Sequence, residues 1–385
     1  MNIFEKLDIK TGINACGTVT RLGGSRLPDE VIRAMADVSK SFVPMHEFHK
    51  KAGSYIAGLL GVEACCITCG AAAGLAISAA ATMTRGDSQK ALQLPDTTGM
   101  PDEILMLKAH RILYDQALLL SGAKIREIDT TLCTAKDIDT DAIKSIDTDI
   151  AKDKIEKAIT NKTALFVYVA ERENVQGSIP LPDIVPILKH HNIPIVVDAA
   201  AEVPPVGNIK KYLDIGADLV LFSGGKEIRG PQASGLILGS KEIIDYCHIN
   251  CCPNYSIGRS MKISKENIAG LIAAVELFTQ KDYNRQMSTW EDMTNQICAS
   301  LADRNDIQVR ASYPAEPGVQ PAIILRAYIK PLKITAAELQ QKLQTASTPV
   351  YVDIKDDEIF LNPQCVEPEE LEPLISTLHE CLDLV

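Results

Sequence analysis

Between about residue 64 and residue 240, short apolar runs alternate with longer segments that have a helical pattern. Short apolar runs bounded by turn residues are typical of buried strands, whereas apolar residues repeating every three to four positions predict helices. We expect strands at 64–68, 91–94, 124–128, 164–169, 194–197, 219–222 and 233–238. We expect helices at 70–83, 103–120, 183–190 and 265–279, and two helical segments between about 137 and 159. This alternation predicts an α/β fold with a mostly parallel sheet covered on both faces.

At the two ends of the chain, helices and strands are not predicted to alternate in this regular way. Gly-rich turns precede a helix that opens at Pro28-Asp29-Glu30, and a second helix runs through 52–60. Beyond about residue 285 we expect strands at 307–311 and 322–328, helices at 335–344 and 367–382, and a hairpin of 350–354 with 358–362. The predicted organisation is therefore an N-terminal arm (1–50), a large domain (51–284) and a small α+β domain (285–385).

Charge and composition argue against a nucleic-acid-binding protein and against a membrane-spanning one. The 39 Lys and Arg residues against 50 Asp and Glu give a net charge of −11, which disfavours nucleic-acid binding because that affinity comes largely from basic residues. No apolar run is long enough to span a membrane, and the N-terminus lacks the pattern of a signal peptide. Eleven cysteines without such a signal indicate a reducing compartment, so we expect a cytoplasmic protein.

Asp198 follows the apolar run 193–197. In open parallel sheets ligands bind beyond the carboxyl ends of the strands, so an acid at this place is a candidate site residue. The competing interpretation is a cap for the segment that follows, which is a common role for Asp.

Lys226 lies in the Gly-rich segment Ser223-Gly224-Gly225-Lys226, directly after another apolar run. Glycines let a backbone approach a flat ligand closely, and the Ser223 hydroxyl can bond a phosphate. The alternative is an exposed loop lysine, the commonest situation for this residue.

Gly70, Ala71 and Ala72 follow a predicted strand and open a predicted helix. Small residues at a helix N-terminus leave backbone N–H groups free to bind a phosphate. Tight helix–sheet packing would favour the same residues, so this turn is weak evidence by itself.

Together the three segments meet the demands of pyridoxal 5′-phosphate (PLP) chemistry: a lysine for the Schiff base, a carboxylate against the pyridine nitrogen, and a phosphate-binding turn. Their order is that of fold-type I (aminotransferase-like) PLP enzymes. Residues 223–235 (SGGKEIRGPQASG) resemble the lysine loop of the selenocysteine synthase family, the L-seryl-tRNA(Sec) selenium transferases, and its shorter relatives. Segments 14–21 (NACGTVTR), 68–75 (TCGAAAGL) and 258–262 (GRSMK) resemble further motifs of that family.

Among the shorter relatives, TCGAAAGL, HRILYDQALLLSGAK and GGKEIRGPQASG look most like the D-glucosaminate-6-phosphate ammonia-lyase group. This resemblance implies a PLP-dependent lyase that releases ammonia from a hydroxylated amino acid or amino-sugar acid. The selenium transferases carry an extra N-terminal tRNA-binding domain, whereas the opening motif here begins at about residue 12, so we expect a small-molecule substrate. The resemblance also implies at least a homodimer.

Several arginines are candidates for the substrate anion, because a guanidinium binds carboxylates and phosphates in a bidentate way. Arg259 ranks first, followed by Arg21 and Arg111, and His110 is a weaker candidate for stacking on the cofactor or for supplying an acid. A transferase that adds sulfur or selenium to an aminoacrylate, an aldolase or racemase, and a non-catalytic protein that retains the fold stay open as alternatives.

No metal site is expected. Cys66-x-x-Cys69 has no second cysteine pair at matching spacing, and the pair lies at a predicted buried strand end, which favours core packing. His46 and His49 lack the H-E-x-x-H spacing of zinc proteases. Cys251-Cys252 raises cysteine desulfurase as a rival within the fold, but the region beyond residue 285 offers cysteines only on or beside expected helices.

Overall fold

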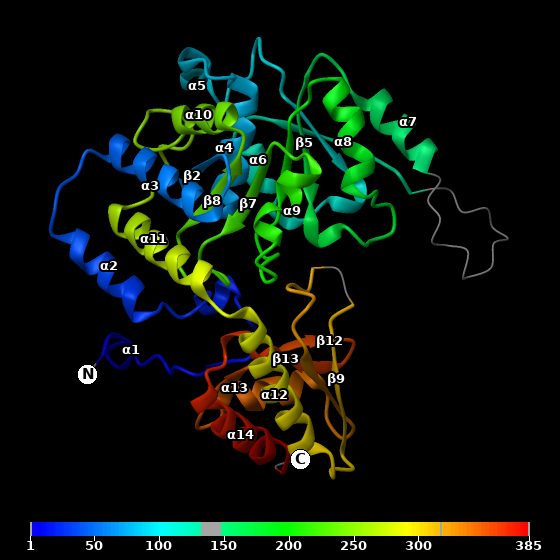
Figure 1. The fold of residues 1–385 in the computed structure, drawn as a ribbon. Coiled ribbons are helices and arrows are strands. Elements are labelled where there is room, and N and C mark those ends of the chain that lie inside the picture. Colours follow the sequence, from blue (N-terminus) through cyan, green and yellow to red (C-terminus); the bar gives the residue numbers. More distant parts are fainter. Residues whose placement is uncertain (1, 132–147, 316–317, 384–385) are drawn as a thin grey trace. The chain divides into compact units, whose positions relative to one another are not determined.

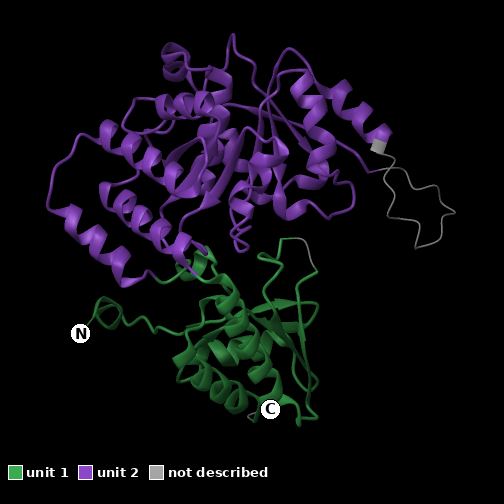
Figure 2. Cartoon of the chain, viewed as in Figure 1, with its two compact units in different colours: residues 1–26, 282–385 green, residues 27–281 purple. Residues whose placement is uncertain are grey.

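The computed structural model describes residues 2–131, 148–315 and 318–383. The chain forms two compact units, which Figure 2 colours separately. Unit 2 comprises residues 27–281, and unit 1 comprises residues 1–26 together with 282–385. None of the helices among the described residues is both long and apolar enough to cross a membrane.

Unit 2 is built on a seven-stranded sheet with the order β2-β8-β7-β6-β5-β3-β4 (Figure 1). Its strands are β2 (Ala64–Thr68), β3 (Glu103–Leu107), β4 (Lys124–Ile128), β5 (Thr163–Val169), β6 (Ile195–Asp198), β7 (Leu219–Ser223) and β8 (Gly235–Gly239). Only β8 runs antiparallel to its two neighbours, so the sheet is mostly parallel, as expected.

Helices cover this sheet. They are α2 (Asp29–Ser39), α3 (Met45–Leu60), α4 (Ala71–Thr84), α5 (Ser88–Gln93), α6 (Gln116–Leu119), α7 (Thr148–Ala158), α8 (Leu181–His190), α9 (Asn208–Ile215), α10 (Lys241–Asn250) and α11 (Lys265–Gln280). Helix α4 is apolar on all sides and buried from Ala73 to Thr84, because it packs on β5, β7 and β8 while α10 covers it. A helix that is apolar on all sides is typically buried in the core. Because α4 is packed on the sheet along its length, its N-terminus is held at the sheet edge.

Unit 1 contains α1 (Ile3–Lys6), β1 (Ile13–Asn14), α12 (Tyr283–Leu301), β9 (Ile307–Ser312), β10 (Arg326–Pro331), α13 (Ala336–Thr345), β11 (Val350–Tyr351), β12 (Asp353–Lys355), β13 (Glu358–Leu361) and α14 (Leu371–Asp383). Its four-stranded antiparallel sheet has the order β12-β13-β10-β9. β1 pairs in parallel with β11, so the first residues of the chain belong with the last hundred.

The segment 1–50, expected to be one arm, therefore divides. Residues 1–26 join unit 1 through β1, whereas α2 packs on α11 within unit 2. The boundary expected after residue 284 falls after residue 281, where the long helix α12 begins.

Two local predictions are wrong. Residues 91–94, expected as a strand, belong mostly to α5, which Asp87 caps by accepting the backbone N–H groups of Gln89 and Lys90 at 2.9 and 3.2 Å. Residues 103–107, expected to begin a helix, form β3 between β5 and β4. Glu, Leu and Met favour helices by themselves, but the place in the sheet decides the outcome. The expected helical segment from 137 to 147 lies outside the described residues.

Candidate active site

Five strand ends of unit 2 meet along one edge of the sheet. Thr68 of β2 and Ser223 of β7 both pair with Gly235 of β8, and Asp198 of β6 pairs with Val169 of β5 and Leu221 of β7. Neighbouring strands lie about 4.8 Å apart, so this register brings the predicted phosphate-binding turn, the Lys226 loop and Asp198 to one edge.

Asp198 is 8% exposed at the end of β6. One oxygen, Oδ1, accepts the backbone N–H of Ala200 at 3.1 Å, which closes a turn. The cap for the following segment, considered from the sequence, therefore exists, but Asp198 caps a turn and not a helix, and it uses only Oδ1 for this. The other oxygen makes no hydrogen bond to the residues that the structure describes. Burial raises the pKa of Asp198 to about 6, although the N–H of Ala200 and the Lys226 ammonium oppose this rise.

The loop between β7 and β8 holds Lys226 through close backbone contacts. Gly224 donates its N–H to the carbonyl of Ser234 at 2.9 Å and accepts the N–H of Gly230 at 2.8 Å. A Cβ on Gly224 would lie 2.2 Å from Oγ of Ser234, so no larger residue fits without displacing the loop. The close contacts of the glycines therefore fix the backbone of the loop that carries Lys226.

Lys226 is half-buried, and burial lowers the pKa of its ammonium group. The carboxylates of Asp198, Glu171 and Glu202 oppose this effect. A lysine with a lowered pKa is a better nucleophile and base near neutral pH than an exposed one.

Gly70 caps the N-terminus of α4 with φ +123°, a conformation that L side chains rarely adopt. Gly70 and Ala71 are half-buried and Ala72 is exposed, so the backbone of this turn is accessible. A Cβ on the neighbouring Gly235 would lie 2.6 Å from the carbonyl carbon of Gly70 and 2.9 Å from the nitrogen of Ala71. Both glycines are required for the shape of the turn.

Two further acids, not among the candidates expected from the sequence, lie at the same edge. Glu171 follows β5, and Glu202 follows β6 four residues after Asp198. Burial, reinforced by the nearby Glu171, raises the pKa of Glu202 to about 7. The rule that found Asp198, a polar residue just beyond a strand's carboxyl end, could have found them as well.

His110 is fully buried, with both ring nitrogens engaged. Nδ1 accepts the backbone N–H of Val169 at 3.0 Å, so Nε2 carries the proton and donates to Oγ of Ser178 at 2.9 Å. Burial lowers the pKa of His110 to about 3. In this arrangement the neutral ring joins the ends of β3 and β5, and neither nitrogen is available to a ligand.

The three candidate arginines lie in different surroundings. Arg111 bonds the carboxylates of Asp115 and Glu127. Arg21 belongs to unit 1 and bonds Asp353 there. Arg259 is exposed, with its guanidinium carbon 6.0 Å from the centre of the Tyr255 ring. Within unit 2, Arg111 and Arg259 therefore contact different groups.

Sequence reasoning also missed Arg326 of unit 1, which is 1% exposed in β10. Its Nη2 donates to the carbonyl oxygens of Gln320 and Pro321 at 3.1 and 3.4 Å. A charged residue inside the apolar run 323–329 was the available signal.

Comparison with known families decides the chain's membership. A family model described as L-seryl-tRNA selenium transferase (SelA) matches residues 121–367, which is more than half of the chain. The chain belongs to the SelA family. The match covers Asp198, Ser223 and Lys226, and the aminotransferase-like α/β fold expected from the sequence is confirmed.

Two curated relatives of this SelA family member are equally similar to it. D-glucosaminate-6-phosphate ammonia lyase of Salmonella typhimurium is 29% identical over 98% of this chain and 97% of its own length. 5′-C-glycyluridine monooxygenase-decarboxylase of a Streptomyces species is also 29% identical, over 98% of this chain and 92% of its own length. A solved structure of D-glucosaminate-6-phosphate ammonia-lyase superimposes with a TM-score of 0.80 at 28% identity, covering 100% and 99% of the two chains.

The buried Asp198 predicts a pH-dependent stability for the cofactor-free protein. Between pH 4 and 7 the unfolded chain ionises this carboxyl more easily than the folded one, so the folded state loses stability as pH rises. Asp198→Asn removes this pH-dependent loss but also the attraction to Lys226, so we predict the change with pH and not the offset: relative to the wild type, its free energy of unfolding should rise by about 3 kcal/mol from acid pH to pH 7. Urea titrations at several pH values measure it.

Asp129→Asn is the matched control with the opposite sign. Hydrogen bonds from Thr131 and Lys108 lower the pKa of the exposed Asp129, so its replacement should cost stability as pH rises toward about 4, with little further change between pH 4 and 7. A difference between Asp198→Asn and the wild type that stays constant with pH would contradict the electrostatic account of Asp198.

Proposed function

We propose that this SelA family member is a PLP-dependent ammonia-lyase that acts on a hydroxylated amino acid or an amino-sugar acid, such as D-glucosaminate 6-phosphate. One observation carries the proposal: Asp198, Lys226 and the N-terminus of α4 share one sheet edge in a chain that matches an ammonia-lyase over nearly its whole length. The ammonia-lyase is similar in fold as well as in sequence.

The residues present fit PLP. Asp198 is 8% exposed, and its second oxygen makes no hydrogen bond to the described residues, so this oxygen can accept a bond from a protonated ring nitrogen. The Gly70 turn offers backbone N–H groups to a phosphate. Ser223 lies near this turn in the sheet, because Ser223 and Thr68, which precedes the turn, both pair with Gly235 of β8. In this proposal Gly70, Ala71, Ala72 and Ser223 hold the phosphate, and Lys226 holds the cofactor covalently.

When bound, PLP supplies an electron-accepting ring that stabilises negative charge at the α-carbon of an amino acid. Asp198 would hold the ring through its nitrogen and favour the protonated form of that nitrogen. Lys226, with its lowered pKa, takes the α-proton on Nζ.

The proposed reaction removes the α-proton and the β-hydroxyl as water, and one water later replaces the amino group. The net products are a 2-keto acid and ammonia. Departure of a hydroxyl needs a proton donor. Glu202, whose pKa of about 7 leaves about half of its carboxyl groups protonated at neutral pH, is the acid at this edge suited to deliver that proton.

The family description favours a second candidate, transfer of a sulfur or selenium nucleophile onto the same dehydrated amino acid. The Streptomyces relative indicates a third, an oxygen-dependent decarboxylation. All three would use Asp198 and Lys226 and differ in the products released. An aldolase or racemase would use the same pair.

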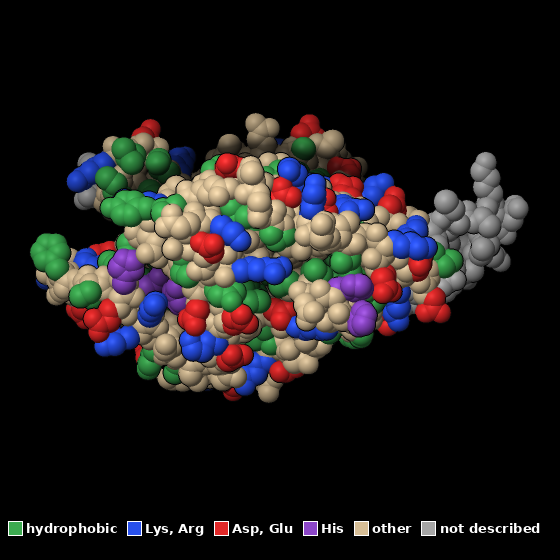
Figure 3. Space-filling view, turned by 90° about the horizontal axis from the view of Figure 1, so that it is seen from above, with side chains coloured by type: hydrophobic (Ala, Val, Ile, Leu, Met, Phe, Trp, Pro, Cys, Tyr) green, Lys and Arg blue, Asp and Glu red, His purple; other side chains and the backbone are tan. Residues whose placement is uncertain are grey.

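A small-molecule substrate is also part of this proposal. The net charge is −11, and Figure 3 shows basic and acidic side chains of the described residues interspersed over the face in view. Tight binding of tRNA would call for a concentration of basic groups. A cytoplasmic location and assembly into at least a homodimer are proposed with it, from the family resemblance.

Product analysis tests the proposal directly. PLP-loaded protein should release equal amounts of ammonia and 2-keto acid from D-glucosaminate 6-phosphate, and Lys226→Ala should lower the rate at least about 1,000-fold, because it removes both the attachment point and the base. D- and L-serine, threonine and cysteine complete the substrate panel.

Two further readouts separate the alternatives. Oxygen uptake with release of carbon dioxide would favour the decarboxylase, and substrate loss only in the presence of sulfide or selenide would favour the transferase. An intact cofactor absorption band without ammonia from any substrate would overturn the lyase proposal.

Gly235→Ala tests the phosphate-binding turn without touching a side chain of the site. The new Cβ would displace the backbone of Gly70 and Ala71, so we expect PLP affinity to fall at least about tenfold, equivalent to about 1.4 kcal/mol. Gly207→Ala is the matched control, since nothing lies within 4 Å of its Cβ and its φ of −57° suits alanine. Unchanged PLP titration of Gly235→Ala would place the phosphate elsewhere.

A further inference from the structure

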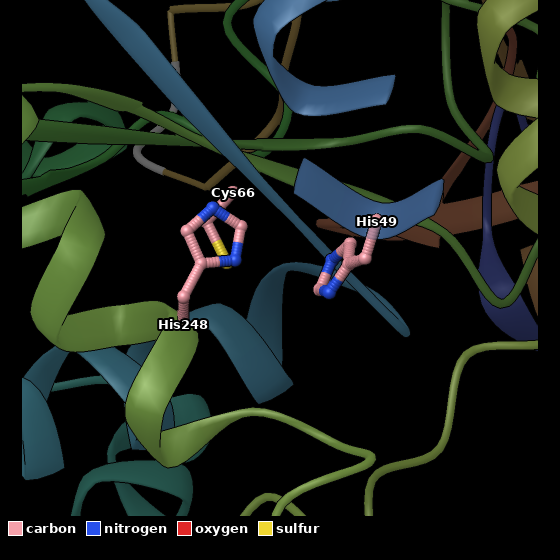
Figure 4. Close-up of side chains that lie close together, drawn as sticks. All are labelled: His49, Cys66 and His248. Atoms are coloured by element: carbon pink, nitrogen blue, oxygen red, sulfur yellow. The ribbon is translucent and has the colours of Figure 1, made fainter. Parts of the chain in front are cut away.

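Three potential metal ligands converge behind the strand that leads to the Gly70 turn. His49 comes from α3, Cys66 from β2 and His248 from α10, and Figure 4 shows the three side chains together. Their donor atoms all lie within 4.8 Å of one another. An ion at the centre of such a triangle would lie about 2.8 Å or less from each donor, so small side-chain rotations reach zinc bond lengths of about 2.0–2.3 Å.

The hydrogen bonding of His49 favours a ligand role. Its Nε2 lies 2.6 Å from the carbonyl oxygen of Ile67, which can only accept, so Nε2 carries the proton and donates. In the neutral ring the lone pair is then on Nδ1. A metal-binding histidine commonly donates its other N–H to a backbone carbonyl, which fixes the tautomer and the ring orientation.

Cys66 contacts two further donors. Its Sγ lies 3.9 Å from Nδ1 of His248 and 3.4 Å from Sγ of Cys251. Ligands of a tetrahedral zinc ion lie about 3.3–3.8 Å apart, as follows from the bond lengths. Cys251 is 2% exposed and lies directly beyond the end of α10, and its contact with Cys66 makes it the candidate for a fourth position.

The cluster has access to solvent. A cavity of about 530 Å³ is lined by His49 and His248, together with His46, Lys50, Asp245 and Cys252 among others. An ion could therefore reach the two histidines without unfolding of the core, whereas Cys66 is fully buried on the inner side.

We propose that His49, Cys66 and His248 bind one zinc ion, with Cys251 as the fourth ligand. Imidazole and thiolate donors in tetrahedral arrangement suit Zn²⁺, whereas the hard cations Mg²⁺ and Ca²⁺ prefer oxygen. The expectation of no metal site considered Cys66-x-x-Cys69 and the pair His46 and His49 as separate motifs, whereas the partners of Cys66 come from two other elements, α3 and α10. The proposal is independent of the ammonia-lyase reaction.

Such an ion would join α3, β2 and α10, and two of its ligands, Cys66 and His248, are 182 residues apart in the sequence. A link that closes a long loop restricts the unfolded chain and stabilises the folded one. Because β2 continues directly into the Gly70 turn, an ion bound to Cys66 of β2 would also restrict movement of that turn.

Metal content tests the proposal. Full-length, PLP-loaded protein produced with zinc in the medium and dialysed against metal-free buffer should retain about one zinc per chain by mass spectrometry. Cys66→Ser and His248→Gln should each retain less than about a fifth of that amount. Cobalt added to chelator-stripped protein should give a thiolate-to-cobalt charge-transfer band that Cys66→Ser lacks.

Two control variants match these changes. Cys65→Ser alters the adjacent buried cysteine of β2, and His46→Gln alters an exposed histidine on the cavity wall, so both should keep the zinc. The PLP absorption band and circular dichroism identify any variant that fails to fold, and His248→Gln then carries the test.

Three outcomes would overturn the proposal. In the first, the wild type binds neither zinc nor cobalt although all its thiols react in the unfolded protein, which shows that they are reduced. The cluster would then be only a packed thiol beside two histidines. Zinc could persist in both Cys66→Ser and His248→Gln. Thiol counting could show a Cys66–Cys251 disulfide in metal-free protein that does not re-bind zinc after reduction.

Discussion

The electrostatic pairing of Asp198 with Lys226 is the constraint on which the rest of the site depends. Burial disfavours the charged form of each group, raising the pKa of the carboxyl and lowering that of the ammonium, and the attraction between them limits both changes. Removing one partner would leave the other buried without its counter-charge, which is costly. The two groups must therefore be placed together, and the fold does so from separate strands.

The sheet supplies this placement through backbone contacts. Asp198 ends β6, and the loop after β7 is held by glycines that approach within distances no side chain would permit. Gly235 likewise sets the Gly70 turn against β8. The candidate site residues are thus held at strand ends and in turns whose backbone positions depend on close contacts of glycine residues.

Much of this frame was predictable from local sequence. The apolar runs that became β2, β5, β6, β7 and β8 are short and bounded by turn residues, and the polar residues at their ends identified Asp198 and Lys226. Local patterns failed where tertiary context decides: 103–107 takes a place inside the sheet, and β1 pairs with a strand more than 300 residues away.

The same limit explains what was missed at the sites. Glu171 and Glu202 follow strand ends and could have been found from the sequence, but their electrostatic effect on Lys226 depends on the three-dimensional structure. The cluster of His49, Cys66 and His248 has no spacing motif, because its members come from three elements. Buried Arg326 stood out in sequence only as a charge in an apolar run.

Reductive trapping tests the central claim most directly. The PLP-loaded protein is treated with sodium borohydride, digested and mapped by peptide mass spectrometry. The account predicts a single pyridoxyl group on Lys226, and none in Lys226→Ala treated in parallel. A pyridoxyl group on another lysine, or none in wild-type protein saturated with PLP, would contradict it.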